Sequence, residues 1–363
     1  MTESYESLRR LFSSAGYGFV EPGLLFDASV FVDLAGEDLR RRLFLTSGAD
    51  GRELTLRPDF TIPVCLQHLA SGPAKRRADY AYLGPVFRQR KDEPGEFLQA
   101  GVESLGRADR TAADADMLGL ALAAVDTLGV PKPSVRIGDS ALFAAVLEAL
   151  DLVEPWRRRL ARAFGDTARL SALLGRLASG DGGLAVEAPA GLGPSSSRPA
   201  VRKIVADMLA RTGLATVGGR SAEEIAERFV EKAALATRNV HAPKVLGHFL
   251  KIAGEPRKAA AAIRKLAAAD NLDIGKAIDR FERRAEGFAE RGIDLARVTF
   301  AADFGRRLDY YTGFVFEIHD RAEAPQIVGG GRYDRLLSLI GAGETVPAIG
   351  FSIWLDRIGS ARP

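Results

Sequence analysis

Residues 80–105 read YAYLGPVFRQRKDEPGEFLQAGVESL, and this stretch determines our expectation for the fold. Apolar residues alternate in its two arms, residues 80–90 and residues 96–105, which is the pattern of half-buried β-strands. Residues 91–95 (KDEPG) lie between the arms and carry the proline and glycine that are typical of a turn-rich connection. The stretch therefore predicts two strands that are neighbours in one sheet.

The second of these strands carries polar side chains at a spacing that favours a small binding slot. Because side chains alternate between the two faces of a strand, Phe97, Gln99, Gly101, Glu103 and Leu105 share one face. The Cα atoms of Gln99 and Glu103 would lie about 13 Å apart, and Gly101 places no side chain between them. This arrangement predicts a slot about the size of a free amino acid, with an amide at one end and a carboxylate at the other. An ordinary half-polar strand is the alternative.

Three other polar residues lie where they could reach that slot. Arg88 is on the neighbouring predicted strand, where it could hold a carboxylate or a phosphate through two hydrogen bonds, or simply pair with Glu103 or Glu96. Asp59 and Thr61 come just before a predicted helix. Either could be the N-cap of that helix, or could bind an ammonium group.

The strand signal returns near the C-terminal end and is absent from the middle of the chain. Residues 142–291 show almost no alternation and are rich in Ala, Leu, Arg and Glu, which favours helices. We therefore expect an α+β protein in which residues 1–141 and 292–363 build one antiparallel sheet flanked by helices, with residues 142–291 as a mostly helical insertion. The expected strands of the C-terminal part are residues 298–304, 312–319, 327–331 and 350–353.

Two short segments between these later strands have unusual compositions. Arg306 precedes the adjacent Tyr310 and Tyr311, which would point in opposite directions in an extended chain, so that at most one of them could face a given pocket. Residues 329–331 are three glycines that come just before Tyr333. Glycines at such a place allow another chain segment or a ligand to approach the backbone closely.

Composition limits the class of protein. Its 363 residues suggest about two domains, and 47% hydrophobic with 27% charged residues exclude a disordered or collagen-like chain. No apolar run reaches the roughly 18 residues of a membrane helix, and the first residues show no secretory signal, so we expect a cytoplasmic protein.

Residue counts also bear on metals and on nucleic acid. One cysteine, Cys65, excludes a disulfide framework and a Cys-based zinc site, and four scattered histidines suggest no metal centre, so we expect no cofactor. The 50 basic and 47 acidic residues leave a net charge of only +3. Short arginine clusters are therefore interpreted as solvated faces, with a phosphate or partner contact as the alternative.

Six segments together resemble histidyl-tRNA synthetase, a class II aminoacyl-tRNA synthetase, in both order and spacing. They resemble motif 1 of that class, an LRPEGT-type segment, motif 2, two histidine-specific signatures and motif 3. In chain order they are GYGFVEPGLLFD (16–27), LRPDFTIP (56–63), FRQRKDEPGEFLQAGVE (87–103), RRLDYYTG (306–313), GGGRYD (329–334) and GFSIWLDR (350–357).

The resemblance implies a histidine pocket. By analogy with the family, three residues would hold the α-amino group, two would face the imidazole, one would be a pocket tyrosine and two would lie near the carboxylate. In that order they are Asp59, Thr61 and Gln99, then Glu103 and Tyr311, then Tyr333, and finally Arg88 and Arg306.

Departures from the synthetase pattern imply a regulatory role. The chain stops six residues after Arg357, where a synthetase continues into an anticodon-binding domain. Arg90 stands where the family has a glutamate that is used at adenine, and the arginine expected just before Phe97 is absent. This anatomy resembles the regulatory subunit of ATP phosphoribosyltransferase, a paralogue of histidyl-tRNA synthetase. That subunit pairs with a short catalytic subunit in the first step of L-histidine biosynthesis.

This second resemblance implies a protein without catalysis of its own that mediates feedback regulation by histidine. It also implies a homodimer through the motif 1 region, residues 16–31, and a hetero-oligomer with the short catalytic subunit. Two alternatives stay open, namely an active histidine-activating synthetase fragment or amino-acid ligase, and a tRNA-like RNA-binding module. Histidine could bind in the synthetase-like pocket or where the two kinds of subunit meet.

Overall fold

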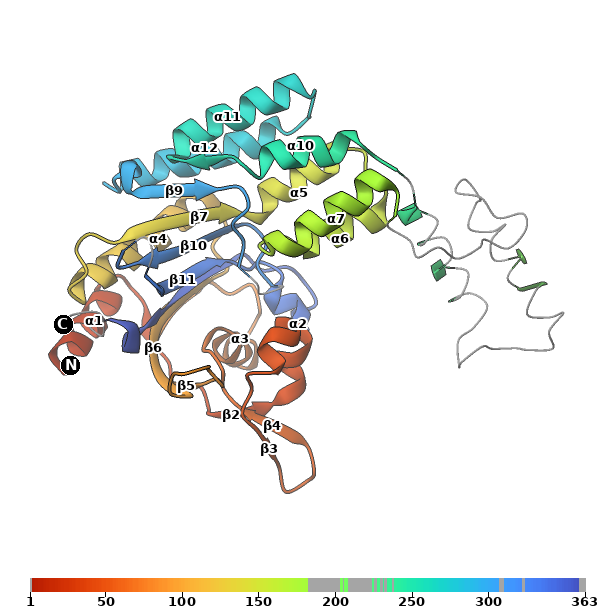
Figure 1. Ribbon diagram of the computed structural model, residues 1–363. Helices are drawn as coiled ribbons and strands as arrows, with labels where there is room; N and C mark the ends of the chain where they lie inside the picture. The colour runs from red at the N-terminus through yellow and green to blue at the C-terminus, as the bar shows by residue number, and fades with distance from the viewer. Residues whose placement is uncertain are drawn as a thin grey trace. The chain divides into compact units, whose positions relative to one another are not determined.

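The computed structural model describes residues 2–181, 238–306, 310–321 and 324–358, together with residues 203–204, 206–207, 224, 227–228, 231 and 234–236 (Figure 1). The chain forms two compact units. The first consists of Met1–Leu142, Lys251–Lys265 and Ile274–Pro363, and the second of Phe143–Leu250 and Leu266–Asp273. Residues 251–265 and 274–291, which we expected in the helical insertion, thus group with the first unit. The domain limits inferred from sequence remain a prediction.

Helices and strands are mixed along the first unit, and its largely antiparallel sheet places it in the α+β class. Its helices are α1 (Thr2–Ser14), α2 (Ala28–Arg40), α3 (Thr61–Ala70), α4 (Arg110–Thr127) and α12 (Gly275–Glu290), while α5 (Ser140–Ala149) and α11 (Pro256–Ala269) contribute residues to both units. Its strands are β1 (Gly18–Phe19), β2 (Leu25–Asp27), β3 (Leu45–Ser47), β4 (Glu53–Leu56), β5 (Ala78–Phe87), β6 (Glu96–Leu105), β7 (Ser134–Asp139), β8 (Ala253–Gly254), β9 (Val298–Ala301), β10 (Phe314–His319), β11 (Gln326–Arg332) and β12 (Ala348–Trp354). Short helical turns at Leu295–Arg297, Ser338–Ala342 and Leu355–Arg357 complete it.

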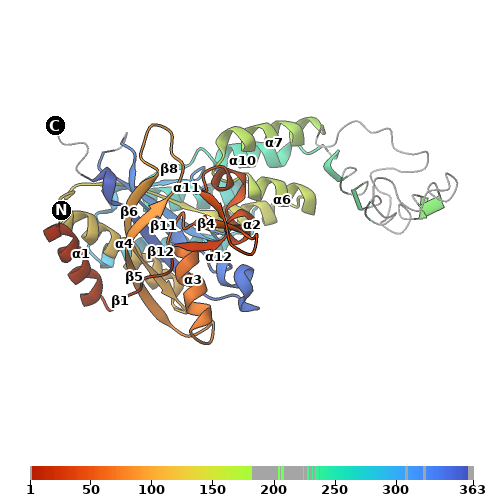
Figure 2. The same ribbon diagram turned by 90° about the horizontal axis from the view of Figure 1, so that it is seen from below.

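Strands from both ends of the chain form one sheet. Among the described residues its order is β1-β5-β6-β12-β11-β10-β7-β9-β8, and Figure 2 shows β5, β6, β12 and β11 side by side. The pairing is antiparallel except between β1 and β5 and between β7 and β9. The predicted α+β class and the sheet built from both ends are thus confirmed, while the two parallel pairs depart from a purely antiparallel sheet.

Several predicted limits were wrong by a few residues. The strand expected to reach Arg90 ends at Phe87, because Arg88 already turns into the connection and its N–H donates to Gly95 O at 2.8 Å. The strand expected to reach Phe304 ends at Ala301. The small sheet with the order β2-β4-β3 was not predicted, because its two outer strands have only three residues each and show no useful alternation.

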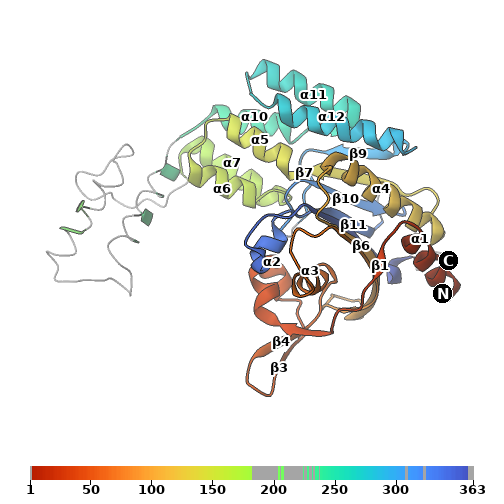
Figure 3. The ribbon, with the colours of Figure 1, turned by 180° about the vertical axis from the view of Figure 1, so that it is seen from behind.

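Helices α4, α12 and α1 pack together beside the sheet. Helix α4 contacts β10, β11 and β12 as well as α12 and α1, and Figure 3 shows α1 next to α4. Its buried side chains include Met117, Leu118 and Val125, which repeat at helical spacing and explain why this segment forms a helix.

A network of buried charges ties these helices to the sheet. Arg284 on α12 donates to Asp114 on α4 at 2.8 Å and to Asp139 at the end of β7 at 2.7 Å. Arg332 on β11 donates to Asp114 at 2.6 Å and to Asp334 at 3.0 Å. Because removing one member of a buried ion pair leaves an uncompensated charge, each arginine is expected to be worth about 3–5 kcal/mol to the fold.

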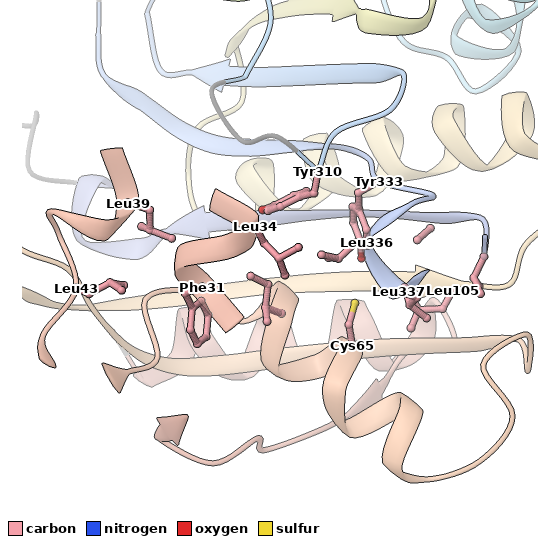
Figure 4. Close-up of a cluster of buried hydrophobic side chains, with 13 residues drawn as sticks. Phe31, Leu34, Leu39, Leu43, Cys65, Leu105, Tyr310, Tyr333, Leu336 and Leu337 are labelled. Atoms are coloured by element: carbon pink, nitrogen blue, oxygen red, sulfur yellow. The ribbon is translucent and has the colours of Figure 1, made fainter. Parts of the chain in front are cut away.

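A hydrophobic core lies between α2, α3 and the segment that follows β11. Figure 4 shows Leu34, Cys65, Tyr333 and Leu336 pointing into this cluster, which also contains Tyr310. All five residues are at most 6% exposed. The two tyrosines belong to segments that we expected at the site. This core and the candidate site therefore share residues.

The second unit is helical in its described part. Its helices are α6 (Glu154–Arg162), α7 (Thr167–Ser179) and α10 (His241–Phe249). The ring of Phe143 stacks on Phe164 with centroids 4.7 Å apart and lies 6.2 Å from Phe249. Asp166 caps α7 by accepting from Arg169 N at 3.0 Å, and Gly180 ends the helix in the left-handed conformation.

No helix among the described residues is long and apolar enough to cross a membrane. Within the same residues, no group of three or more His, Cys, Asp or Glu side chains is placed to hold a metal ion.

Candidate functional site

One face of the central sheet is rich in glycine, and larger side chains lie directly on its backbone. A Cβ atom at Gly350 on β12 would collide with the carboxylate of Glu103, which is its neighbour on β6. A Cβ at Gly329 on β11 would collide with the guanidinium of Arg306. A Cβ at Gly331 would lie 2.9 Å from the ring of Tyr311. These glycines therefore make room for side chains of the site, as the close approach expected for GGGRYD requires.

The carboxylate of Glu103 lies at the centre of this face and is held by hydroxyl groups. Thr61, the first residue of α3, donates to Oε1 at 2.7 Å. The hydroxyl of Tyr333 donates to Oε2, and that of Tyr82 lies 3.4 Å from Oε1. Glu103 is 1% exposed, and burial raises its pKa from 4.5 to about 8, while the bonds from Tyr333 and Thr61 oppose that rise.

Asp59 and Arg88 carry opposite charges and attract each other beside Glu103, although no salt bridge joins them among the described residues. Asp59 accepts from Ile62 N at 3.4 Å, so it helps to satisfy the first turn of α3, whereas Thr61 turns to Glu103 instead. Nε of Arg88 donates to Pro58 O at 2.5 Å. Burial raises the pKa of Asp59 and lowers that of Arg88, so in both groups desolvation outweighs the attraction between them. Neither salt bridge suggested for Arg88 is found among the described residues.

Arg306 lies across β11 at Gly329 and is buried. Its Nη1 donates to Glu317 Oε1 on β10 at 3.0 Å, and its side chain is 10% exposed. Its Nε has no hydrogen-bond partner among the described residues. The guanidinium lies 5.8 Å from the ring centroid of Tyr311 and 5.9 Å from that of Trp354.

Tyr310 and Tyr311 both face the same pocket, so the prediction that at most one could do so was wrong. Their ring centroids are 4.9 Å apart at 46°. The prediction assumed an extended chain, but these residues lie in the turn before β10 rather than in a strand. In a turn, successive side chains need not point in opposite directions.

Seven of the eight residues expected at the site line one pocket. They are Asp59, Thr61, Arg88, Glu103, Arg306, Tyr311 and Tyr333. The pocket has a volume of about 40 Å³, which is space for a few water molecules rather than for an amino acid. Side chains of the pocket must therefore move before a ligand of that size can enter.

Gln99 is the expected residue that does not line this pocket. Its side chain is fully buried, and neither its oxygen nor its nitrogen has a hydrogen-bond partner among the described residues. The slot expected between Gln99 and Glu103 is filled by Tyr82, because Tyr82 on β5 lies directly opposite Gly101 in the register. A Cβ at Gly101 would lie 2.5 Å from the Tyr82 hydroxyl. The ring of Tyr82 stacks on that of Phe60 at 4.3 Å.

Arg90 folds back on motif 2. Its guanidinium lies 3.8 Å from the ring centroid of Phe97. It pairs with Glu93 at 2.6 Å and with Asp356 at 2.8 Å, and Nε donates to Pro94 O at 2.8 Å. The side chain of Arg90 is 9% exposed, so a fixed cation covers the ring of Phe97.

Sequence reasoning missed some members of the site. Tyr82 was visible as an aromatic residue on the first predicted strand, but its place over Gly101 depends on the register of two strands. Glu317 lies on a predicted strand, yet only the path of Arg306 across Gly329 shows that it belongs to the site. Trp354 and Ser352 line the pocket from β12, a strand that is distant in sequence from β6.

Comparisons with known proteins agree with one another on the family. The family model described as Histidyl-tRNA synthetase matches residues 1–182 and 202–358. An ATP phosphoribosyltransferase regulatory subunit from Allorhizobium ampelinum is 44% identical, with 97% of this chain and 95% of that protein covered. One of the same name from Rhizobium rhizogenes is 45% identical over 94% of this chain and 93% of that protein. One from Brucella ovis is 42% identical over 98% and 96%.

Solved structures show the same fold. An ATP phosphoribosyltransferase regulatory subunit/histidyl-tRNA synthetase from Bacillus halodurans superposes with a TM-score of 0.67 and 21% identity, covering 100% of this chain and 79% of that one. A histidine–tRNA ligase subunit from Alicyclobacillus acidocaldarius gives a TM-score of 0.60 and 23% identity, covering 98% and 91%. The class II synthetase-like fold expected from the six motifs is thus confirmed.

Proposed function

The chain belongs to the family of ATP phosphoribosyltransferase regulatory subunits, and from that premise we propose that it is a non-catalytic subunit required for the first step of L-histidine biosynthesis. It acts with a short catalytic subunit in the cytoplasm. Histidine, the end product, binds it and reduces the activity of the complex. The family name supports the regulatory role, and the pocket supports the choice of histidine as effector.

The pocket's chemistry carries this proposal. Histidine is a zwitterion with a heteroaromatic ring, so its site needs an acceptor for N–H groups, cationic groups for the carboxylate and apolar walls for the ring. Glu103 and Asp59 supply acceptors, Arg88 and Arg306 supply the cationic groups, and Tyr311 supplies an aromatic wall within one pocket. The proposal requires side chains to move outward, since the pocket now holds only about 40 Å³.

The motif 2 segment supports the absence of catalysis. The resemblance assigns position 90 to a glutamate that is used at adenine, and here a cation occupies it. Arg90 is fixed by Glu93 and Asp356 and covers the ring of Phe97, so neither the carboxylate nor a free aromatic face is available for a nucleotide base there. Adenylate formation requires a clamped ATP, and this segment is occupied by its own side chains.

Purified chain tests the proposal directly. With ATP, magnesium and histidine it should form no adenylate in a pyrophosphate-exchange assay. Mixed with a short ATP phosphoribosyltransferase catalytic subunit it should raise that subunit's activity, and histidine should lower the activity of the mixture. Exchange at a synthetase-like rate would identify an active enzyme instead. RNA affinity that falls steeply with salt would favour an RNA-binding module.

Glu103→Gln should weaken histidine binding. Gln keeps the size of the side chain but cannot ionise, so it cannot become the charged acceptor that a cationic ligand favours, and the loss should be about 1–3 kcal/mol, or roughly ten- to a hundred-fold in affinity. Because coupling between sites is reciprocal, the variant should need more histidine for the same inhibition of the complex, while activation at zero histidine stays intact. Calorimetry on the chain measures the affinity, and the activity of the complex at increasing histidine concentration measures the inhibition. Unchanged affinity would place the effector site elsewhere, and the interface between the two kinds of subunit would be the next candidate.

The motif 1 region supports the proposed homodimer. Leu24 and Leu25 are 46% and 53% exposed at β2, and Leu45 on β3 is 51% exposed, so both outer strands of the small sheet present leucine to solvent. Exposed leucines at unpaired strand edges favour association with another chain. A second copy that covers β2 and β3 would bury these side chains.

A further inference from the structure

The path of Arg306 across the sheet depends on one glycine. Gly329 on β11 lies directly opposite Glu317 on β10 in the antiparallel register. The three heavy atoms nearest to a Cβ built at Gly329 all belong to the guanidinium of Arg306. Because Gly329 has no side chain, Arg306 can cross this strand and donate to Glu317 at 3.0 Å.

Glu317 is the only carboxylate within salt-bridge distance of Arg306 among the described residues. The other charged groups around Glu317 are His319, whose Nε2 lies 3.7 Å from Oε2, and Arg136, its register partner on β7. Arg136 in turn pairs with Asp303 at 3.3 Å. Glu317 therefore receives Arg306 on one oxygen and His319 on the other.

Arg306 keeps donor capacity after this contact. Its side chain lines the pocket at 10% exposure, and its Nε has no acceptor among the described residues. A buried guanidinium with an unsatisfied N–H is costly unless an acceptor reaches it. The pocket is the place from which such an acceptor can come.

We propose that Glu317 is a positioning residue that holds Arg306 across Gly329, so that the Nε–H of Arg306, which has no partner among the described residues, recognises the carboxylate of the ligand. This rests on the proposed function, in which the ligand is histidine. Glu317 does not touch the ligand. It removes the entropy cost of fixing a long side chain and it balances the buried charge before the ligand arrives.

The mechanism predicts an effect on only one end of the ligand. L-histidinol keeps the imidazole and the amino group of histidine but has a hydroxymethyl group in place of the carboxylate. Calorimetry on the full chain should therefore show that Glu317→Gln weakens histidine about tenfold, the usual cost of a hydrogen bond to a charged group, while histidinol changes by less than about twofold. The ratio of the two affinities is the decisive quantity, because general damage to the fold would weaken both ligands.

A second variant displaces Arg306 without touching Glu317. Gly329 lies in strand β11 without a left-handed φ, so its backbone allows Gly329→Ala, and the three atoms nearest to the new Cβ all belong to the far end of the Arg306 side chain. It should lower the histidine-to-histidinol ratio as Glu317→Gln does. The double variant should lower this affinity ratio no more than the stronger of the two single variants does, because both substitutions act through Arg306. Asp303→Asn is the matched control, since it removes a nearby carboxylate that pairs with Arg136 rather than with Arg306.

The outcomes separate this proposal from the one on which it rests. If Glu317→Gln leaves the ratio of the two affinities unchanged, whether both affinities fall equally or neither falls, the role of Glu317 is overturned and the effector site stays in place. No histidine binding by the unmodified chain would overturn both proposals. A ratio that falls equally in Asp303→Asn would assign the effect to general electrostatics and would also overturn the role of Glu317.

Discussion

Glu103 is a carboxyl group that the fold keeps out of water. Hydroxyl groups from Thr61 and Tyr333 reach its two oxygens, and the carboxyl is fully buried. Burial raises its pKa to about 8, which favours the protonated acid at neutral pH. A ligand that brings a cationic group would favour the ionised form instead.

The pH dependence of stability should report this protonation. Glu103 titrates near 4.5 in the unfolded chain and near 8 in the folded one, so between these values the folded state holds a proton that the unfolded state lacks. The unfolding free energy of the wild type relative to Glu103→Gln should therefore fall as pH rises from about 5 to 8, by about 3–5 kcal/mol. Urea unfolding of both proteins at several pH values gives this difference. A difference that stays constant with pH would show that Glu103 is already ionised in the fold.

The sequence predicted which residues form the site better than it predicted the contacts that these residues make. Alternation placed Glu103 on one face with Gln99 and Gly101, and the resemblance grouped it with residues from distant segments. Gln99 shows the limit, because alternation put it on the same face but could not show that Tyr82 fills the space between it and Glu103. Local pattern specifies a face, whereas the pairing of strands decides which side chain occupies it.

At the scale of elements, β6 depends on Gly101. A Cβ there would collide with Phe351 O on β12, which is backbone and cannot move aside. Gly101→Ala should therefore destabilise the fold by at least about 1–3 kcal/mol, the cost of overpacking.

Gly119 in α4 is the matched control for this substitution. A Cβ there meets nothing within 4 Å, so Gly119→Ala should stabilise the protein by about 0.5–1 kcal/mol through the helix propensity of alanine. Thermal unfolding of the two variants compares them. Equal effects would mean that the close packing of β6 against β12 is not maintained in solution.

Long periodic elements were predictable and short ones were not. Helix α4 and strands β6 and β10 follow from their repeats, since each is long enough to show its period. The two- and three-residue strands carry no period, and their existence depends on partners elsewhere in the chain. The same holds for the order of the sheet, which places β12 beside β6 although the chain between them is long.

At the scale of the whole molecule, the exposed leucines of the small sheet should determine the oligomeric state. Leu25→Glu should weaken the proposed homodimer, because a charge would then be buried where two copies meet. Val240→Glu is the control, since Val240 is 59% exposed and lies outside the motif 1 region. Light scattering at micromolar concentration measures both variants. A wild type that is already monomeric, or a Leu25→Glu variant that stays dimeric, would contradict the assignment of this surface.

The strand order also governs when the first unit can fold during synthesis. Strands β6 and β7 are made early, but β12, β11 and β10 lie between them, and β12 ends at Trp354. Roughly 250 residues separate the end of β6 from that point, which is on the order of ten to fifty seconds of translation at about 5–20 residues per second. During that time the nascent chain carries two open strand edges, and Asp114 of α4 has not yet met Arg332. The sheet can therefore close only once β12 has left the ribosome, and a ribosome that stalls before β12 is made leaves a fragment with exposed edges that invite aggregation.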